Sequence, residues 1–143
     1  MNKNYPEVDF QRLLEFEQHY ADSIDGTPAA KKYYARVAHY RFSAVFTGEK
    51  RPLDPGVFAS MKRVFKLLIG NPKQLNELVQ NEYGFQVGEK LLWMPIQFTL
   101  EKAFKKELKR GKSAKLYCLF LNEHGLKRQL YNTFLISEFR KEE

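Results

Sequence analysis

Residues 93–115 read WMPIQFTLEKAFKKELKRGKSAK, and this stretch decides how the chain divides. It holds the only tryptophan, in an extended segment that Pro95 closes. Apolar residues then recur at helical spacing, which predicts an amphipathic helix over 96–110 that Gly111 ends. The apolar positions of this pattern are Leu100, Phe104 and Leu108. The stretch therefore predicts a joint between two differently built parts of the chain.

Before this joint, proline and glycine positions predict four helices. Three times a residue with a capping side chain precedes a proline, as at many helix starts. These pairs are Thr27-Pro28, Asp54-Pro55 and Asn71-Pro72. Glycines stand where the preceding helices would end, because glycine adopts the left-handed conformation of many helix ends. We therefore expect helices at about 9–25, 28–47, 55–69 and 72–83.

After residue 84 the pattern changes to short extended segments. Residues 85–87 and 91–94 are expected to be extended, and 116–121 and 130–136 to form strands around a turn. Helices followed by strand, helix, strand and strand predict an α+β fold, with an N-terminal four-helix region and a small antiparallel sheet. We expect a single domain, 1–143, with a helical half (1–84) and a mixed half (85–143).

Composition limits the class of protein. The chain has 143 residues, of which 43% are hydrophobic and 29% charged, and a formal net charge of +7, as expected for a basic globular protein. The N-terminus lacks the apolar core of a signal peptide, and no apolar run approaches the ~20 residues of a membrane span. The lone Cys118 is expected to be buried. These features favour a cytoplasmic protein without a membrane span.

The C-terminal portion carries the pattern G-x-K-x-x-W-x-x-I-Q at Gly88–Gln97 and, later, L-I-S-E-F at Leu135–Phe139. On these residues, about 50 positions of the chain resemble uncharacterised bacterial proteins. The resemblance implies no activity, and no residue role is taken from it.

The predicted helix over 96–110 gives the first candidate site, a basic face. Phe98 falls on the helical wheel among the cations, where charge could hold phosphates and the ring could stack on a base. The candidates are Phe98, Lys102, Lys105, Lys106, Lys109 and Arg110. The competing interpretation is a solvated face whose last-turn cations complement the helix dipole.

The predicted helix over 28–47 gives a second candidate, a ring-lined pocket between the two halves. Arg36 could share a helical face with both His39 and Tyr40, and such a face could bind a carboxylate or phosphate. The pocket candidates are Tyr34, Arg36, His39, Tyr40 and Trp93. The competing interpretation is a central helix whose tyrosine and histidine side chains are satisfied core groups.

The sequence shows no metal-ligand spacing, phosphate loop or nucleophile motif, so we expect no catalytic residue, metal or cofactor. Three functions remain open. The first is a noncatalytic binding module for an anionic or protein partner, including a second copy of the chain. The second is a nucleic-acid-binding protein that uses the basic face. The third is a small-molecule binder or small enzyme with the aromatic pocket.

Overall fold

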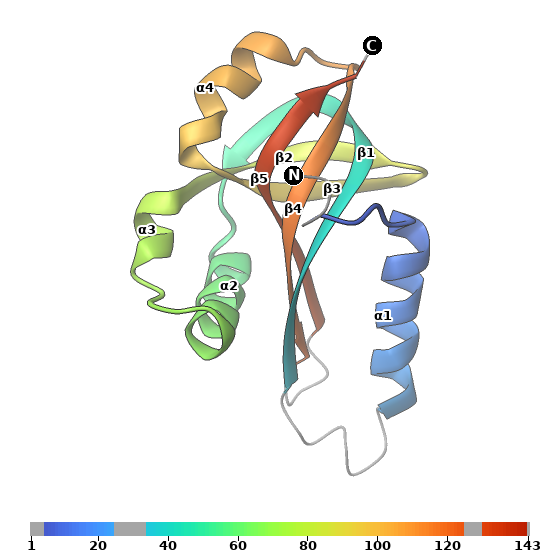
Figure 1. Cartoon of the computed structure of the whole chain (residues 1–143), viewed down its shortest axis with the longest axis vertical. Helices are drawn as coiled ribbons and strands as arrows, with labels where there is room; N and C mark the ends of the chain where they lie inside the picture. Colours follow the sequence, from blue (N-terminus) through green and yellow to red (C-terminus); the bar gives the residue numbers. More distant parts are fainter. Residues whose placement is uncertain (1–4, 25–33, 125–129, 143) are drawn as a thin grey trace.

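The computed structural model describes residues 5–24, 34–124 and 130–142, apart from the side chains of residues 22–24 and 34. Within these residues there are four helices and five strands (Figure 1). In chain order these are α1 (Phe10–Ile24), β1 (Tyr34–Pro52), α2 (Pro55–Leu68), α3 (Gln74–Leu78), β2 (Val79–Val87), β3 (Lys90–Gln97), α4 (Phe98–Glu107), β4 (Ser113–His124) and β5 (Leu130–Lys141).

The expected helix over 28–47 is wrong, because residues 34–47 belong to the long strand β1. Aromatic and β-branched residues are common in this segment and favour a strand. Alternate side chains, among them Phe42, Ala44 and Phe46, are buried in one apolar cluster, while Ser43 and Val45 between them are exposed. This period of two is the strand period. The expected helix start at Thr27-Pro28 lies outside the described residues.

The five strands form one closed barrel in the order β1-β2-β3-β5-β4, which corrects the expected small three-strand sheet. The first part of β1 pairs antiparallel with β4, and its last part pairs with β2. The register shifts between Phe46 and Lys50, where Gly48 has a φ of 88°. Glycine adopts this conformation without strain, so the strand bends there and joins both sides of the barrel.

Two further helix boundaries differ from expectation. Instead of a helix over 72–83, the short α3 ends at Leu78 and β2 follows directly. The helix expected over 96–110 is shorter, since Pro95 and Ile96 lie in β3 and α4 ends at Glu107. Among the described residues, α1 alone precedes the barrel, so the expected N-terminal four-helix region is wrong, although the α+β character is confirmed.

All five strands contribute to the apolar interior of the barrel, which includes Phe42, Phe85, Ile96, Phe120 and Ile136. In Figure 1, α1 and the α2–α3 pair lie on opposite sides of the long strands. Helix α4 lies at the top of the view, near the end of the strands that is closest to the C-terminus. The fully buried Phe104 of α4 packs into this interior, so most other side chains of the helix lie on the surface.

The strand order places β4 beside β1, followed by β2 and β3, which is a Greek key. A five-stranded Greek-key barrel is the architecture of the OB-fold. Here the connection between β1 and β2 carries two helices, α2 and α3, and the connection between β3 and β4 carries α4.

Candidate functional site

A groove of about 800 Å³ runs along α4 where this helix meets the end of β1 and the start of β2. We call it the α4 groove. It is lined by Lys50 of β1, Gln80 and Asn81 of β2, and Phe98, Thr99, Glu101, Lys102, Lys105 and Lys106 of α4. Three elements that are far apart in sequence thus contribute polar side chains to one surface.

The buried carboxylate of Glu101 anchors the groove. Its side chain is 6% exposed and accepts hydrogen bonds from Asn81 Nδ2 at 3.1 Å and from the Tyr83 hydroxyl at 2.9 Å. Burial, followed by the hydrogen bond to Glu101, raises the pKa of Tyr83, which therefore stays a donor. These neutral donors hold the carboxylate in place, and it is the one carboxylate beside the four lysines of the groove lining.

Two lysines meet above this carboxylate. Lys50 Nζ lies 3.9 Å from Glu101 Oε1, too far for a hydrogen bond but close enough to form an ion pair. The pKa of Lys50 is nevertheless lowered from its ordinary value, first by its side-chain contact with Lys105, then by burial and by the charge of Lys105. The contact with Lys105 and burial together oppose the charge of Lys50 more strongly than Glu101 supports it.

The rim of the groove adds charge and one ring. Lys102 and Lys106 are exposed on α4, and Phe98 at the start of the helix is 49% exposed. The lining therefore carries four lysines and one carboxylate, a local excess of positive charge. A half-exposed phenyl ring beside this charge can stack against a planar group of a ligand.

The structure separates Lys109 and Arg110 from the other candidates on the expected basic face. Both follow the end of α4 at Glu107 and are absent from the groove lining. Lys109 Nζ donates to the backbone oxygen of Lys105 at 3.4 Å, while the Arg110 side chain packs over Gly48. These two residues therefore have structural partners at the barrel end.

The described residues of the expected aromatic pocket lie on two strands, β1 and β3. Arg36 and Tyr40 share a face of β1, with Arg36 Nη1 donating to the Tyr40 hydroxyl at 3.3 Å, and Arg36 also pairs with the buried Glu17 of α1. Side chains alternate between the two faces of a strand, and His39 comes three residues after Arg36, so His39 lies on the opposite face of β1. Trp93 lies on β3. The side chain of Tyr34 lies outside the described part.

His39 and Trp93 each have a different neighbour. The His39 ring packs edge-on to the Tyr5 ring, with centroids 5.2 Å apart. The guanidinium of Arg51 lies over the Trp93 ring, 4.0 Å from its centroid. Trp93 therefore carries a cation from its own chain, while the Phe98 ring at the α4 groove has no such cover among the described residues.

A second cavity of about 500 Å³ lies between α1 and strands β3 and β5. Its lining mixes Glu15, His19 and Lys90 with apolar side chains of Leu14, Leu92 and Phe134. Opposite charges balance there, so this cavity does not favour a ligand of either sign. It is a weaker candidate than the α4 groove.

Groups that could carry out a reaction are sparse in the described ranges. No cluster of three or more His, Cys, Asp or Glu residues with metal-binding geometry occurs among the described residues. Cys118 is fully buried in β4, and burial raises its pKa well above the ordinary value, which keeps the thiol protonated. No helix in this part of the chain combines the length and apolar character needed to cross a membrane.

Sequence reasoning missed the groove residues that lie outside the basic face, above all Lys50, Asn81 and Glu101. Glu101 follows Leu100 in α4, and its side chain is buried. Lys50 and Asn81 come from β1 and β2, which the sequence assigned to helices or to their ends. No local signal brings these residues to α4, because strand pairing does so.

The chain was compared with protein-family models, curated proteins and solved structures. None of these three comparisons gives a match.

Proposed function

We propose that this protein is a noncatalytic binding module whose α4 groove recognises an anionic partner, with single-stranded nucleic acid as the best-fitting ligand. One observation carries the proposal: four lysines and a half-exposed phenyl ring line the same groove. Phosphate groups would replace the missing counter-charge at Lys50 and Lys105, and a base would stack on Phe98. Binding to phosphates releases counterions and gives affinity without sequence preference.

The exposed ring favours single-stranded nucleic acid over other polyanions. Stacking of a base on an aromatic side chain contributes about 1–3 kcal/mol per base and needs an unpaired base. Phe98 is available for this contact, whereas Arg51 lies over the Trp93 ring. A carboxylate-rich protein segment could use the lysines but would gain little from Phe98.

The barrel architecture adds indirect support. OB-folds bind oligonucleotides and oligosaccharides on their strand surfaces and loops. The same architecture hosts many functions, so this analogy supports the proposal without carrying it. A cytoplasmic location is part of the proposal, and the free, buried Cys118 is consistent with a reducing compartment.

The test is fluorescence anisotropy with a labelled single-stranded oligonucleotide of about 15 nucleotides, a length that spans the usual site size. The affinity should fall steeply with salt. Lys102→Glu/Lys105→Glu should weaken binding and reduce the salt slope by about 0.7 for each phosphate that is no longer neutralised. Phe98→Ala should weaken binding about tenfold with the slope unchanged. Lys62→Glu/Lys66→Glu, the same charge change on α2, is the matched control and should have little effect.

Absent or salt-independent binding would refute the proposal. A third arm uses a polyglutamate peptide in place of the oligonucleotide. Tighter binding of this peptide, abolished in Lys102→Glu/Lys105→Glu but not in Phe98→Ala, would assign the groove to an acidic protein partner instead.

A further inference from the structure

The C-terminal end of α2 exposes three consecutive large aliphatic side chains. Leu67, Leu68 and Ile69 are 58%, 48% and 44% exposed. Single exposed apolar residues are common on protein surfaces, whereas three in a row concentrate apolar side chains at one end of the helix, as at many interaction sites. The chain turns away immediately after them at Gly70, so the three side chains form the tip of the helix.

The tip does not belong to the core of its own chain. Met61, Val64 and Phe65 of α2 are buried against Leu121 and Leu135 of the barrel, and they complete the packed face of the helix. At its other end, Asp54 accepts a hydrogen bond from the Val57 backbone N–H at 3.1 Å and caps the helix. Helix α2 is therefore firmly seated and presents its tip in a fixed position.

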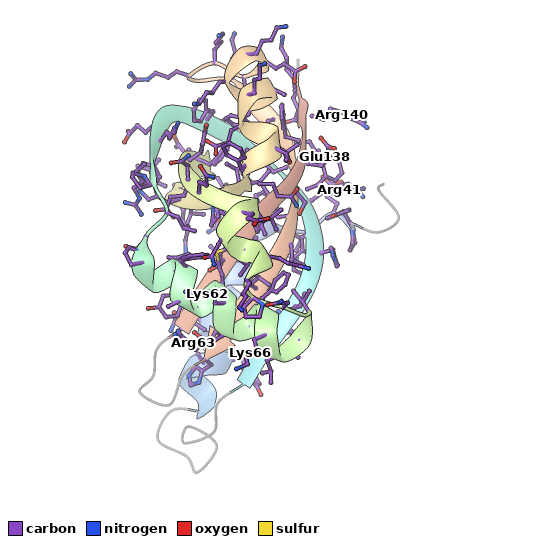
Figure 2. The ribbon with its side chains drawn as sticks, turned by 90° about the vertical axis from the view of Figure 1, so that its left-hand side faces the viewer. Arg41, Lys62, Arg63, Lys66, Glu138 and Arg140 are labelled. Atoms are coloured by element: carbon purple, nitrogen blue, oxygen red, sulfur yellow. The ribbon has the colours of Figure 1, made fainter. Side chains whose placement is uncertain are left out.

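The surroundings of the tip are basic. Residues 55–76 contain four basic residues and no acidic one. Figure 2 shows Lys62, Arg63 and Lys66 along the face of α2 that this view presents. Arg63 forms a bidentate ion pair with the buried Glu123, at 2.7 Å for each contact. Lys62 and Lys66 on α2 and Lys73 after the turn are exposed, and Lys62 Nζ lies 4.6 Å from the centroid of the Phe58 ring.

We propose that this tip, Leu67–Ile69 with Lys62, Lys66 and Lys73, docks the protein onto an anionic lipid surface. The aliphatic side chains enter the boundary between headgroups and acyl chains, and the lysines contact lipid phosphates and carboxylates. Lysine suits this geometry because its apolar stem follows the aliphatic residues while the ammonium group stays at the headgroups.

The chemistry of the tip favours lipid over a protein groove. Leu67, Leu68 and Ile69 carry no polar side-chain atom, so they offer no directional contact that would select one protein partner. A lipid surface requires none, and its negative charge complements the three lysines. None of these residues lines the α4 groove, so this inference stands apart from the nucleic-acid proposal.

The test is co-sedimentation of the full chain with vesicles of phosphatidylcholine alone or with one-third phosphatidylserine. Binding should require phosphatidylserine and weaken with salt. Leu67→Ser/Leu68→Ser should reduce the partition coefficient by about tenfold or more. Lys62→Glu/Lys66→Glu should reduce it by at least about fivefold per lysine. Leu91→Ser, at a leucine of β3 that is 71% exposed, is the matched control and should bind as the unchanged chain does.

Three results of the vesicle assay would overturn the inference. They are absence of binding to either vesicle, equal loss of binding in the Leu91→Ser control, and retention of binding in Leu67→Ser/Leu68→Ser. Far-UV circular dichroism and the thermal midpoint verify that each variant is folded. If the chain instead self-associates without vesicles, and Leu67→Ser/Leu68→Ser abolishes that association, the tip contacts a second copy and the lipid assignment is wrong.

Discussion

Helix α4 contains two phenylalanines in opposite environments, and truncating each to alanine gives a sharp test of the fold. Phe104 is fully buried, with its ring centroid 5.0 Å from those of Phe46 and Tyr83 and 5.1 Å from that of Phe139. Phe98 is 49% exposed. Phe104→Ala removes a ring from the barrel end and leaves a cavity, which costs about 3–5 kcal/mol of unfolding free energy.

Phe98→Ala should cost much less. Full burial of a phenyl side chain contributes about 1.5–3 kcal/mol, so a half-exposed ring contributes about 1 kcal/mol. The measurement is urea unfolding followed by the fluorescence of Trp93, with linear extrapolation to water. A domain stability of about 5–15 kcal/mol makes the loss at Phe104 large but measurable. Equal losses for the two variants, or a loss below about 2 kcal/mol for Phe104→Ala, would refute the assigned burial.

Three further predictions concern single sites. Gly84→Ala should lower the unfolding free energy by about 1–3 kcal/mol, because its Cβ would lie 2.5 Å from Thr47 Oγ1. Gly70→Ala, where a Cβ meets open space, should change the thermal midpoint little. Equal shifts of the midpoint in the two variants would contradict this. The raised pKa of Tyr83 means that folding stability falls as pH rises above about 10, where the unfolded phenol ionises first, and Tyr83→Phe should flatten that part of a urea-midpoint profile. Cys118 should react with a thiol reagent only after denaturant is added, and fast labelling of the native chain would show that it is accessible.

The sequence predicted the helices whose ends carry local signals. Asp54 does cap α2, and Pro55 is its first residue, so a helix over 55–69 is close to the observed one. The apolar spacing that ends in Phe104 and Leu108 correctly placed a helix there, and both residues are buried. Such features are decided by residues within one or two turns, which explains why they can be read without the fold.

The long strand β1 shows where this reasoning failed. A proline after Thr27 and a glycine at position 48 suggested the two ends of a helix, yet Gly48 provides the bend of a strand. The alternation of buried Phe42, Ala44 and Phe46 is present in the sequence, but a helical period was assigned to it. Only part of the α4 groove could be predicted from the sequence. Lys102, Lys105 and Lys106 lie on one helix, whereas strand pairing brings Lys50 of β1 to the groove.

The neighbouring strands of the barrel pair over very different lengths. In the described residues, β3 and β5 meet through one bridge, Ile96 to Ile136, whereas β1 and β4 pair along twelve consecutive positions from Tyr34–His124 to Val45–Ser113. Local opening should therefore begin at the β3–β5 seam, and amide hydrogens of β3 should exchange faster than those of β4. Helix α4 connects β3 to β4 beside this seam. A ligand that bridges α4, the end of β1 and the start of β2 would therefore also slow local opening of the barrel.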